Sequence, residues 1–405
     1  MSAEKKQLLA FSLFFVLYES IIYLSNDMIM PAMLQVVADF HARNSDIALS
    51  LSLYLLGGSS LQIVLGPLVE RLGKRRVMLV GNLLFLFATS LIPFAASMDQ
   101  FLAARFFQGM GSCFIFIGYA VIHESFDDVE AVKLTTILAN VAIFAPLIGP
   151  VVGSTVVSYL HWQYVFALSF AVGLLTLLGL YRTMPAGQPA GTRFDLRAAV
   201  RSYGRIFRCP TFLFGIVLAG IALVPLTAWI GLSPAIVMDT MHASYGVYIA
   251  YQCLIFSGFI LATFAVQWLG DRLPLAALIR GGGALAMLGM SGFGLLHAQP
   301  LVFIGGMFLF SVGFGLFNGA LIRLAMTATG EPMGMTSAAM SLLYCVVIAA
   351  GLEAYNRWCD AGGYTLASYA AANIPVGIVV FIGLLCFLRL QGRGTVPVQA
   401  QPVVA

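Results

Sequence analysis

The chain has 405 residues, of which 60% are hydrophobic and only 9% are charged. Soluble domains have about 25% charged residues, so no water-soluble packing hides this much apolar surface at this length. The net charge of +4 is small, and we expect no nucleic-acid partner because such binding needs a clustered basic face. The composition therefore predicts an all-α polytopic membrane protein.

Twelve apolar stretches are long enough to cross a membrane, which takes about 20 residues. They cover residues 8–33, 46–69, 77–97, 100–123, 133–159, 162–183, 210–238, 245–269, 275–297, 300–327, 334–357 and 366–389. A Pro/Gly-rich and then basic segment separates the first six stretches from the last six. We therefore expect an N-terminal six-helix bundle over 1–184, a linker over 185–209 and a C-terminal six-helix bundle over 210–405.

The basic residues are distributed unevenly. The linker arginines at 193, 197, 201, 205 and 208 recur every three or four residues, which predicts an amphipathic helix on the membrane surface. These and nearly all other Lys and Arg residues fall on one side of the membrane if the N-terminus is cytoplasmic. The positive-inside rule thus predicts that the two termini and the linker are cytoplasmic.

The first span contains two acids, Glu19 and Asp27, in an otherwise apolar run. Glu19, Tyr23 and Asn26 share one helix face, and Asp27 lies roughly 80° round the helix from Glu19. An acid that is neutral when buried and ionised when wetted can carry a proton, and it is a natural counter-charge for a cationic solute. Two structural alternatives remain open: Asp27 caps the helix, or Glu19 has a buried partner.

A loop after the second span reads GPLVERLGKRR over residues 66–76. Glu70 and the cations that follow it can form an ion-pair network that latches one conformation. The alternative is that these cations only anchor the loop at the membrane surface.

Arg105 lies in the fourth span and shares a helix face with Gln108. A guanidinium cannot shed its charge in a protein, so inside the membrane it needs hydrogen-bond acceptors. The alternative is that Arg105 reaches the nearby membrane surface.

The fifth span carries APLIGPVVGS over residues 145–154. Its two prolines bend a helix, and Ala145, Gly149 and Gly153 let another helix pack closely. The simplest interpretation is a kinked packing helix. In the eleventh span, Glu353 and Arg357 are spaced for a local ion pair.

These stretches resemble the signature loop, the R-x-x-Q-G motif and the G-P-x-x-G antiporter motif of the major facilitator superfamily. The chain is similar to the twelve-span drug/proton antiporters of that superfamily over nearly its whole length. It departs by carrying Glu70 where Asp is usual, which lengthens the acidic arm of the latch. The resemblance implies twelve helices in two six-helix bundles that rock around a central cleft.

The resemblance also implies roles for individual residues. It assigns proton coupling to Glu19, Asp27 and Arg105. It places substrate contacts at Glu19, Tyr23, Asn26, Asp27, Gln108, Tyr119, Ala139, Asn140 and Trp229. It assigns the conformational latch to Gly66, Glu70, Arg71, Gly73, Lys74 and Arg75. It assigns the antiporter motif to Pro146, Gly149, Pro150 and Gly153.

The first functional hypothesis is a proton-coupled exporter of lipophilic, often cationic drug-like compounds, acting as a monomer and contributing to antibiotic resistance. A dedicated exporter of one metabolite such as a siderophore, a non-transporting membrane receptor and an importer are the alternatives. The motifs GxSxG, HExxH and GxxxxGK[ST] are absent, so we expect no enzyme activity, no cofactor and no direct drive by ATP. The six cysteines and five histidines show no ligand spacing, so we also expect no metal site.

Overall fold

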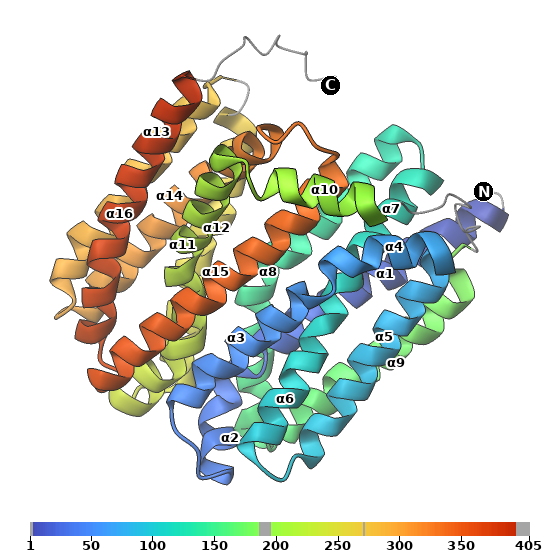
Figure 1. Ribbon diagram of the computed structural model, residues 1–405. Coiled ribbons are helices and arrows are strands. Elements are labelled where there is room, and N and C mark those ends of the chain that lie inside the picture. Colours follow the sequence, from blue (N-terminus) through green and yellow to red (C-terminus); the bar gives the residue numbers. More distant parts are fainter. Residues whose placement is uncertain (1–2, 186–195, 270–271, 394–405) are drawn as a thin grey trace.

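The computed structural model describes residues 3–185, 196–269 and 272–393, and these fold into helices joined by short turns (Figure 1). Each of the twelve predicted spans coincides with a helical segment. Among the described residues, ten segments are long and apolar enough to cross a membrane. Ser45–Ser60 and Gln62–Leu72, bent by 41° at their junction, make an eleventh if the pair is one span, and Phe144–Tyr159 is a shorter apolar helix. The chain is therefore a multi-pass membrane protein.

The helices before the linker pack against one another. α1 contacts α8 and α9, α3 contacts α6, and α5 contacts α6 and α9. Their bounds are α1 Ala3–Asp27, α2 Met33–Asp39, α3 Ser45–Ser60, α4 Gln62–Leu72, α5 Lys74–Leu91, α6 Met98–Gly109, α7 Ile115–Ser125, α8 Asp128–Tyr159 and α9 Gln163–Thr183.

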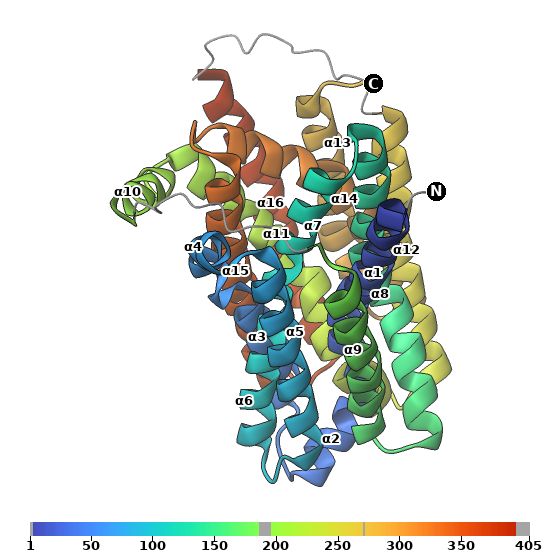
Figure 2. The same cartoon turned by 90° about the vertical axis from the view of Figure 1, so that its right-hand side faces the viewer.

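The helices after the linker form a second group, in which α14 contacts α12 and α13, and α11 contacts α15 and α16. Their bounds are α11 Pro210–Ser233, α12 Tyr245–Leu269, α13 Leu275–Met287, α14 Pro300–Thr327, α15 Met333–Ala361 and α16 Leu366–Arg393, with a π-helical turn Pro234–Thr240 after α11. The predicted linker helix is present as α10 (Leu196–Ile206), and it lies across one end of the molecule (Figures 1 and 2).

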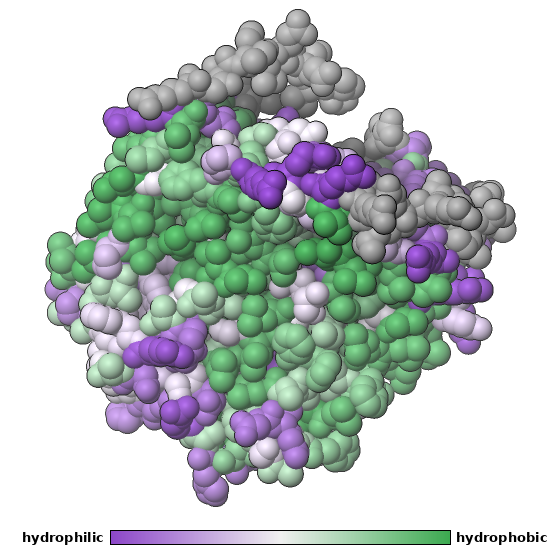
Figure 3. All heavy atoms as spheres, in the orientation of Figure 1, coloured by the Kyte–Doolittle hydropathy of each residue, from purple (hydrophilic) through white to green (hydrophobic). Residues whose placement is uncertain are grey.

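We call the end that carries α10 the linker face and the opposite end the far face. The start of α1 and the end of α16 both lie toward the linker face (Figure 2). Charged residues gather around α10, next to a broad apolar surface (Figure 3). This arrangement fits a helix that lies at the membrane boundary.

Two breaks in the helices differ from the predicted spans. The first span ends as a regular helix at Asp27 and continues through the 3-10 turn Met30–Ala32 into α2, because Pro31 lacks a backbone donor. The second span bends at Leu61, directly after the small residues 57–60. Gly57 is needed there, since a Cβ at this position would lie 2.0 Å from the Phe106 carbonyl oxygen on α6.

The two groups of helices meet along α3 with α15 and along α8 with α12. At the far face, Asn44 Nδ2 donates to Asp239 Oδ2 at 2.9 Å, and Asn356 Nδ2 donates to the Ser45 carbonyl at 2.8 Å. Tyr364 supports Asn356 by donating to its Oδ1 at 3.0 Å. These bonds, which we call the far-face clasp, join the two groups at this end. Asn356 is also close to the predicted Glu353–Arg357 ion pair, which is confirmed at 2.8 Å.

Candidate functional site

Arg105 is completely buried within the first group of helices, so the alternative in which it reaches the surface is wrong. Its three guanidinium nitrogens each find an acceptor: Nε donates to Ser50 Oγ at 3.2 Å, Nη1 to Gln108 Oε1 at 2.5 Å and Nη2 to Asn26 Oδ1 at 2.9 Å. The Tyr54 ring lies 4.5 Å from the guanidinium carbon, in cation–π geometry. The charge is therefore held by α1, α3 and α6 together.

Asn26 links this arginine to the acid at the end of α1. Its amide oxygen accepts from Arg105, and its amide nitrogen donates to Asp27 Oδ1 at 3.1 Å. Asn26 and Asp27 are both buried, with 9% and 5% of their surface exposed. Because an amide has a donor end and an acceptor end, Asn26 satisfies a cation and an anion at the same time.

Glu19 lies two turns earlier on α1 and is 1% exposed. Its Oε1 accepts a hydrogen bond of 3.1 Å from the Tyr119 hydroxyl on α7, and its Oε2 has no hydrogen-bond partner among the described residues. A buried carboxylate oxygen without a partner is costly, unless it is protonated or meets a cation. Glu19 thus has one hydrogen-bonded oxygen and one oxygen that can bind a proton or a cationic ligand.

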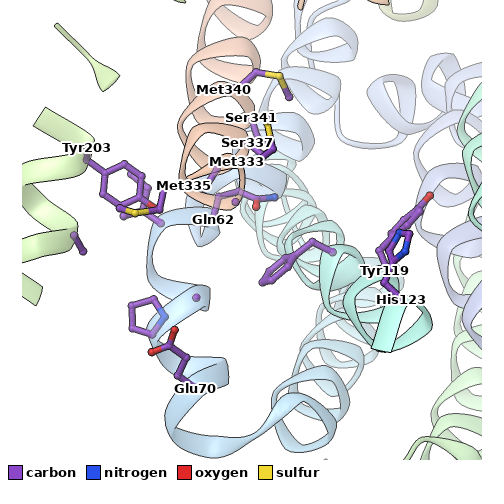
Figure 4. A pocket seen from close by; sticks show the side chains of 17 residues that line it. Gln62, Glu70, Tyr119, His123, Tyr203, Met333, Met335, Ser337, Met340 and Ser341 are labelled. Carbon is purple, nitrogen blue, oxygen red and sulfur yellow. The ribbon is translucent and has the colours of Figure 1, made fainter. Parts of the chain in front are cut away.

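A cavity of about 880 Å³ lies between the two groups of helices at the linker face (Figure 4). α4, α7, α10 and α15 supply its walls, and Tyr119 lines it together with His123 on one side. His123 and Met333 are exposed, so the cavity opens to the outside at this end. Tyr119 therefore connects the cavity to Glu19.

The lining of this cavity is mainly apolar and adaptable. Methionine, phenylalanine and tyrosine supply its large side chains, small residues and a few polar ones complete it, and Glu70 is its carboxylate among the described lining residues. Unbranched methionine side chains fit irregular ligands, and aromatic faces attract cations. The prominent lining residues are Phe116, Tyr119, Tyr203, Met333, Met335 and Met340.

The predicted antiporter motif on α8 lies directly against the end of α1. A Cβ on Gly149 would be 2.5 Å from the Asp27 Cβ, and one on Gly153 would be 1.9 Å from the Met28 carbonyl oxygen. The prediction that these glycines allow close packing is confirmed. α8 remains helical through Pro146 and Pro150.

The predicted latch loop contains two cations that are tied elsewhere in this conformation. Lys74 pairs with Glu124, and Arg75 donates to the Tyr181 carbonyl at 2.5 Å. Glu70 has no ion pair among the described residues and lines the cavity instead. Gly73 turns the chain between α4 and α5 with φ = 83°, a left-handed backbone that glycine adopts readily.

Three other predicted substrate-contact residues do not line the cavity. Gln108 holds Arg105 and donates to Thr89 Oγ1 at 3.0 Å. Trp229 is buried among Tyr369 and Phe303 in the second group of helices. Tyr23 is partly buried in the core. The side chains of Ala139 and Asn140 on α8 lie outside the described residues.

The sequence reasoning missed Ser50 and Thr89, which complete the hydrogen bonding around Arg105 and Gln108. It also missed the cavity walls supplied by α10 and α15. Single hydroxyl residues within apolar spans give no periodic signal. Only the spacing of Arg105 and Gln108 pointed toward this cluster.

The chain matches the family model for the Major Facilitator Superfamily over residues 15–352. It is 36% identical over 396 residues to the multidrug transporter MdfA of Yersinia pestis, which covers 95% of each chain. It is 38% identical over 355 residues to MdfA of Edwardsiella ictaluri, covering 86% of each, and 34% identical over 396 residues to MdfA of Escherichia coli O6:H1, covering 96% of each.

Two solved structures show the same fold. A bacterial homologue of the human lysosomal transporter Spinster superposes with a TM-score of 0.72 at 15% identity, covering 97% of this chain and 98% of that one. A D-xylose–proton symporter superposes with a TM-score of 0.70 at 14% identity, covering 92% of this chain and 97% of that one. At these identities the likeness concerns the fold alone.

Proposed function

Because the chain belongs to the major facilitator superfamily, we propose that it is a proton-coupled antiporter that exports bulky lipophilic compounds, many of them cationic. The observation that carries this proposal is the pair of buried acids on α1, with Glu19 reached from the cavity through Tyr119. The relatives described above are multidrug transporters, which supports a broad range of drug-like substrates.

Proton and substrate compete for the same acids in this mechanism. A cation that enters the cavity replaces the proton on Glu19, because either species neutralises the unpartnered oxygen. Asp27 senses the charge of Arg105 through Asn26, at the end of α1. Substrate and proton thereby shift one two-state equilibrium through their different affinities for its two states.

The moving parts are the two groups of helices, assigned as bundles over residues 1–184 and 210–405 with the linker between them. In the described conformation the far-face clasp joins the bundles and the cavity opens at the linker face. Export requires the opposite arrangement, in which the clasp separates and the latch loop around Glu70 closes against α15.

The chain has one orientation in the membrane and one assembly state in this proposal. The basic residues of the latch loop and of α10 lie at the linker face, so we place that face and both termini in the cytoplasm of a bacterium, with the chain in the inner membrane. The protein acts as a monomer and is not an enzyme. Protons, the small-molecule substrate and lipid are its partners.

The lining of the cavity supports a broad substrate range over a single metabolite. Its methionine and aromatic side chains can repack around ligands of different shape, and they offer few fixed hydrogen-bond partners. A dedicated site would instead satisfy the polar groups of one ligand. Binding of a panel of unrelated lipophilic cations distinguishes the two.

Proton release tests the coupling directly. Purified protein in weakly buffered detergent solution, mixed with tetraphenylphosphonium, is expected to release protons that a pH-sensitive dye detects. Glu19→Gln and Asp27→Asn should each reduce the release, and the double variant should abolish it together with export. Asp99→Asn, at an exposed position in the first turn of α6, is the matched control. Full release and export by the double variant would refute the mechanism.

A further inference from the structure

A second hollow lies beside the main cavity, between α4 and α10. This groove measures about 370 Å³, and its walls are mainly apolar. Val64 on α4 and Val200 on α10 line it and are 58% and 62% exposed. Val64 belongs to the bent candidate span, so its exposed side chain faces lipid in the membrane, and Val200 lies on α10 at the membrane boundary. The groove therefore opens toward the bilayer.

The groove and the main cavity are adjacent. Ile63, Pro67, Ala199 and Tyr203 line both of them, so these four side chains form the wall between the two hollows. Tyr203 is the largest of the four and is only partly buried. Figure 4 shows its ring reaching from α10 toward Met335 and Gln62 in the cavity.

Consecutive residues of α4 face the two hollows with opposite charges. Arg71 lines the groove, and Glu70 lines the cavity. An arginine at the edge of an apolar surface extends to the level of the lipid headgroups. A carboxylate on the inner side attracts a cation that has left the lipid. With Arg71 at the groove and Glu70 at the cavity, the two charges favour a cation that passes from the membrane into the cavity.

α10 is held in place from the other side. Ile206 is buried, and Arg205 makes an ion pair with Glu331 in the turn before α15. A second bond, from Arg205 Nη2 to Glu331 Oε2, measures 3.1 Å. α10 is therefore fastened to α15 of the second bundle, while it faces α4 of the first bundle across the groove. Rocking of the bundles must widen or narrow the groove.

From this geometry we infer that the groove between α4 and α10 is a side entrance, through which a lipophilic cation dissolved in the adjoining membrane leaflet reaches the cavity. The Tyr203 side chain separates the groove from the cavity, and the ligand displaces it on entering the cavity. The inference rests on the proposed function for its substrate class, but it concerns the route rather than the coupling.

An access route has a kinetic signature that differs from that of a binding site. Narrowing the route slows association and dissociation by the same factor, because it raises one barrier without changing either end state. The dissociation constant then stays constant. Loss of a binding contact raises the dissociation constant and mainly speeds dissociation.

The test uses the full chain in lipid nanodiscs and rhodamine 6G, a fluorescent lipophilic cation, in stopped-flow binding measurements. Val64→Trp fills the groove and should slow association by about tenfold, within the range seen for variants of one interface, with an unchanged dissociation constant. Val80→Trp is the matched control, because Val80 on α5 is 57% exposed and does not line the groove. Tyr203→Ala should speed association.

Val200→Trp blocks the groove from its other wall and gives an independent result if Val64→Trp does not fold. Association as fast as in the wild type for both tryptophan variants would overturn the inference, since the ligand would then enter through the open end of the cavity. A raised dissociation constant with unchanged association would also overturn it, because the groove would then be a binding site. Wild-type binding without proton release would overturn the proposed function alone, and no wild-type binding would overturn both.

Discussion

Gly149 on α8 lies against Asp27 at the end of α1, so close that a Cβ on the glycine would be 2.5 Å from the Asp27 Cβ. Four residues on, Gly153 meets the backbone at Met28 in the same way. The two glycines therefore let α8 pack closely against the end of α1, where one of the two buried acids lies. Any movement of α8 changes the packing around Asp27.

Gly149→Ala is expected to push α8 away from α1, because real side chains do not tolerate a carbon–carbon contact of this length. Overpacking of this kind costs about 1–3 kcal/mol, and here it should also impair export by displacing Asp27. Thermal unfolding in detergent and export rate measure the two effects. Gly305→Ala is the control, since a Cβ on Gly305 meets nothing within 4 Å. Equal behaviour of the two variants would contradict the packing role.

Asn26→Ala should leave the buried Arg105 without one acceptor and Asp27 without its donor. Hydrogen bonds to charged groups contribute about 1.5–3 kcal/mol each, so we expect a clear loss of stability and of transport. Asn26→Asp keeps an acceptor for Arg105 but has no amide to donate to Asp27. The two adjacent buried carboxyl groups should then share a proton, which should impair coupling even though Arg105 keeps its acceptor. Unfolding measurements on both variants separate the two contacts, and a fully active Asn26→Ala protein would rule out the bridge.

Tyr119→Phe removes only the hydroxyl that donates to Glu19. The ionised form of Glu19 loses its one hydrogen bond, so cation binding should weaken by about 1 kcal/mol, or roughly fivefold in dissociation constant. Neutral ligands should be affected much less. Equilibrium binding of one cationic and one neutral ligand makes the comparison. An equal loss for both would indicate that the ring only shapes the cavity.

The contact between α10 and the second bundle should depend on pH. Hydrogen bonds and charge attraction from Arg205 hold the pKa of the Glu331 carboxyl below its ordinary value. A lowered pKa in the folded state means that the contact is complete at neutral pH. The contact is lost as the pH falls below about 4.3, the ordinary pKa of a glutamate, and then through the lower pKa that Glu331 has in the folded protein. Limited trypsin digestion should find the linker protected at pH 7.

Glu331→Gln should remove most of this protection at every pH, and Arg205→Lys should keep part of it, since lysine preserves the charge but not the two-nitrogen contact. Linker digestion that does not change between the wild type and Glu331→Gln would show that this ion pair does not hold α10 in place.

Asn356→Ala should loosen the far-face clasp. Asn356 is buried, bonds across the bundles to the Ser45 carbonyl and is itself held by Tyr364. Its loss should shift the equilibrium toward a state open at the far face, by about 1 kcal/mol for the one hydrogen bond. In an Ala48→Cys background, the cysteine, which replaces a residue buried against Gly231 of α11, would then react faster with a water-soluble maleimide. Tyr364→Phe should have a smaller effect in the same direction, and unchanged labelling in both variants would exclude the clasp as a gate.

The sequence by itself determined which segments cross the membrane, because hydropathy is a local property and about 20 apolar residues have no other stable environment. It also determined the basic linker helix, the helix-face pairing of Arg105 with Gln108 and the small-residue stripe of α8. These features depend on residues within a few turns of one another.

Only the tertiary structure decided which of these features meet. Asn26 lies 79 residues from Arg105, and Tyr119 lies 100 residues from Glu19, so no pattern within one span shows that either pair bonds. The wall between cavity and groove likewise combines α4 with α10, which are far apart in the chain. Periodicity fixes the face that a helix turns inward, but the partner on that face depends on how all the helices pack together.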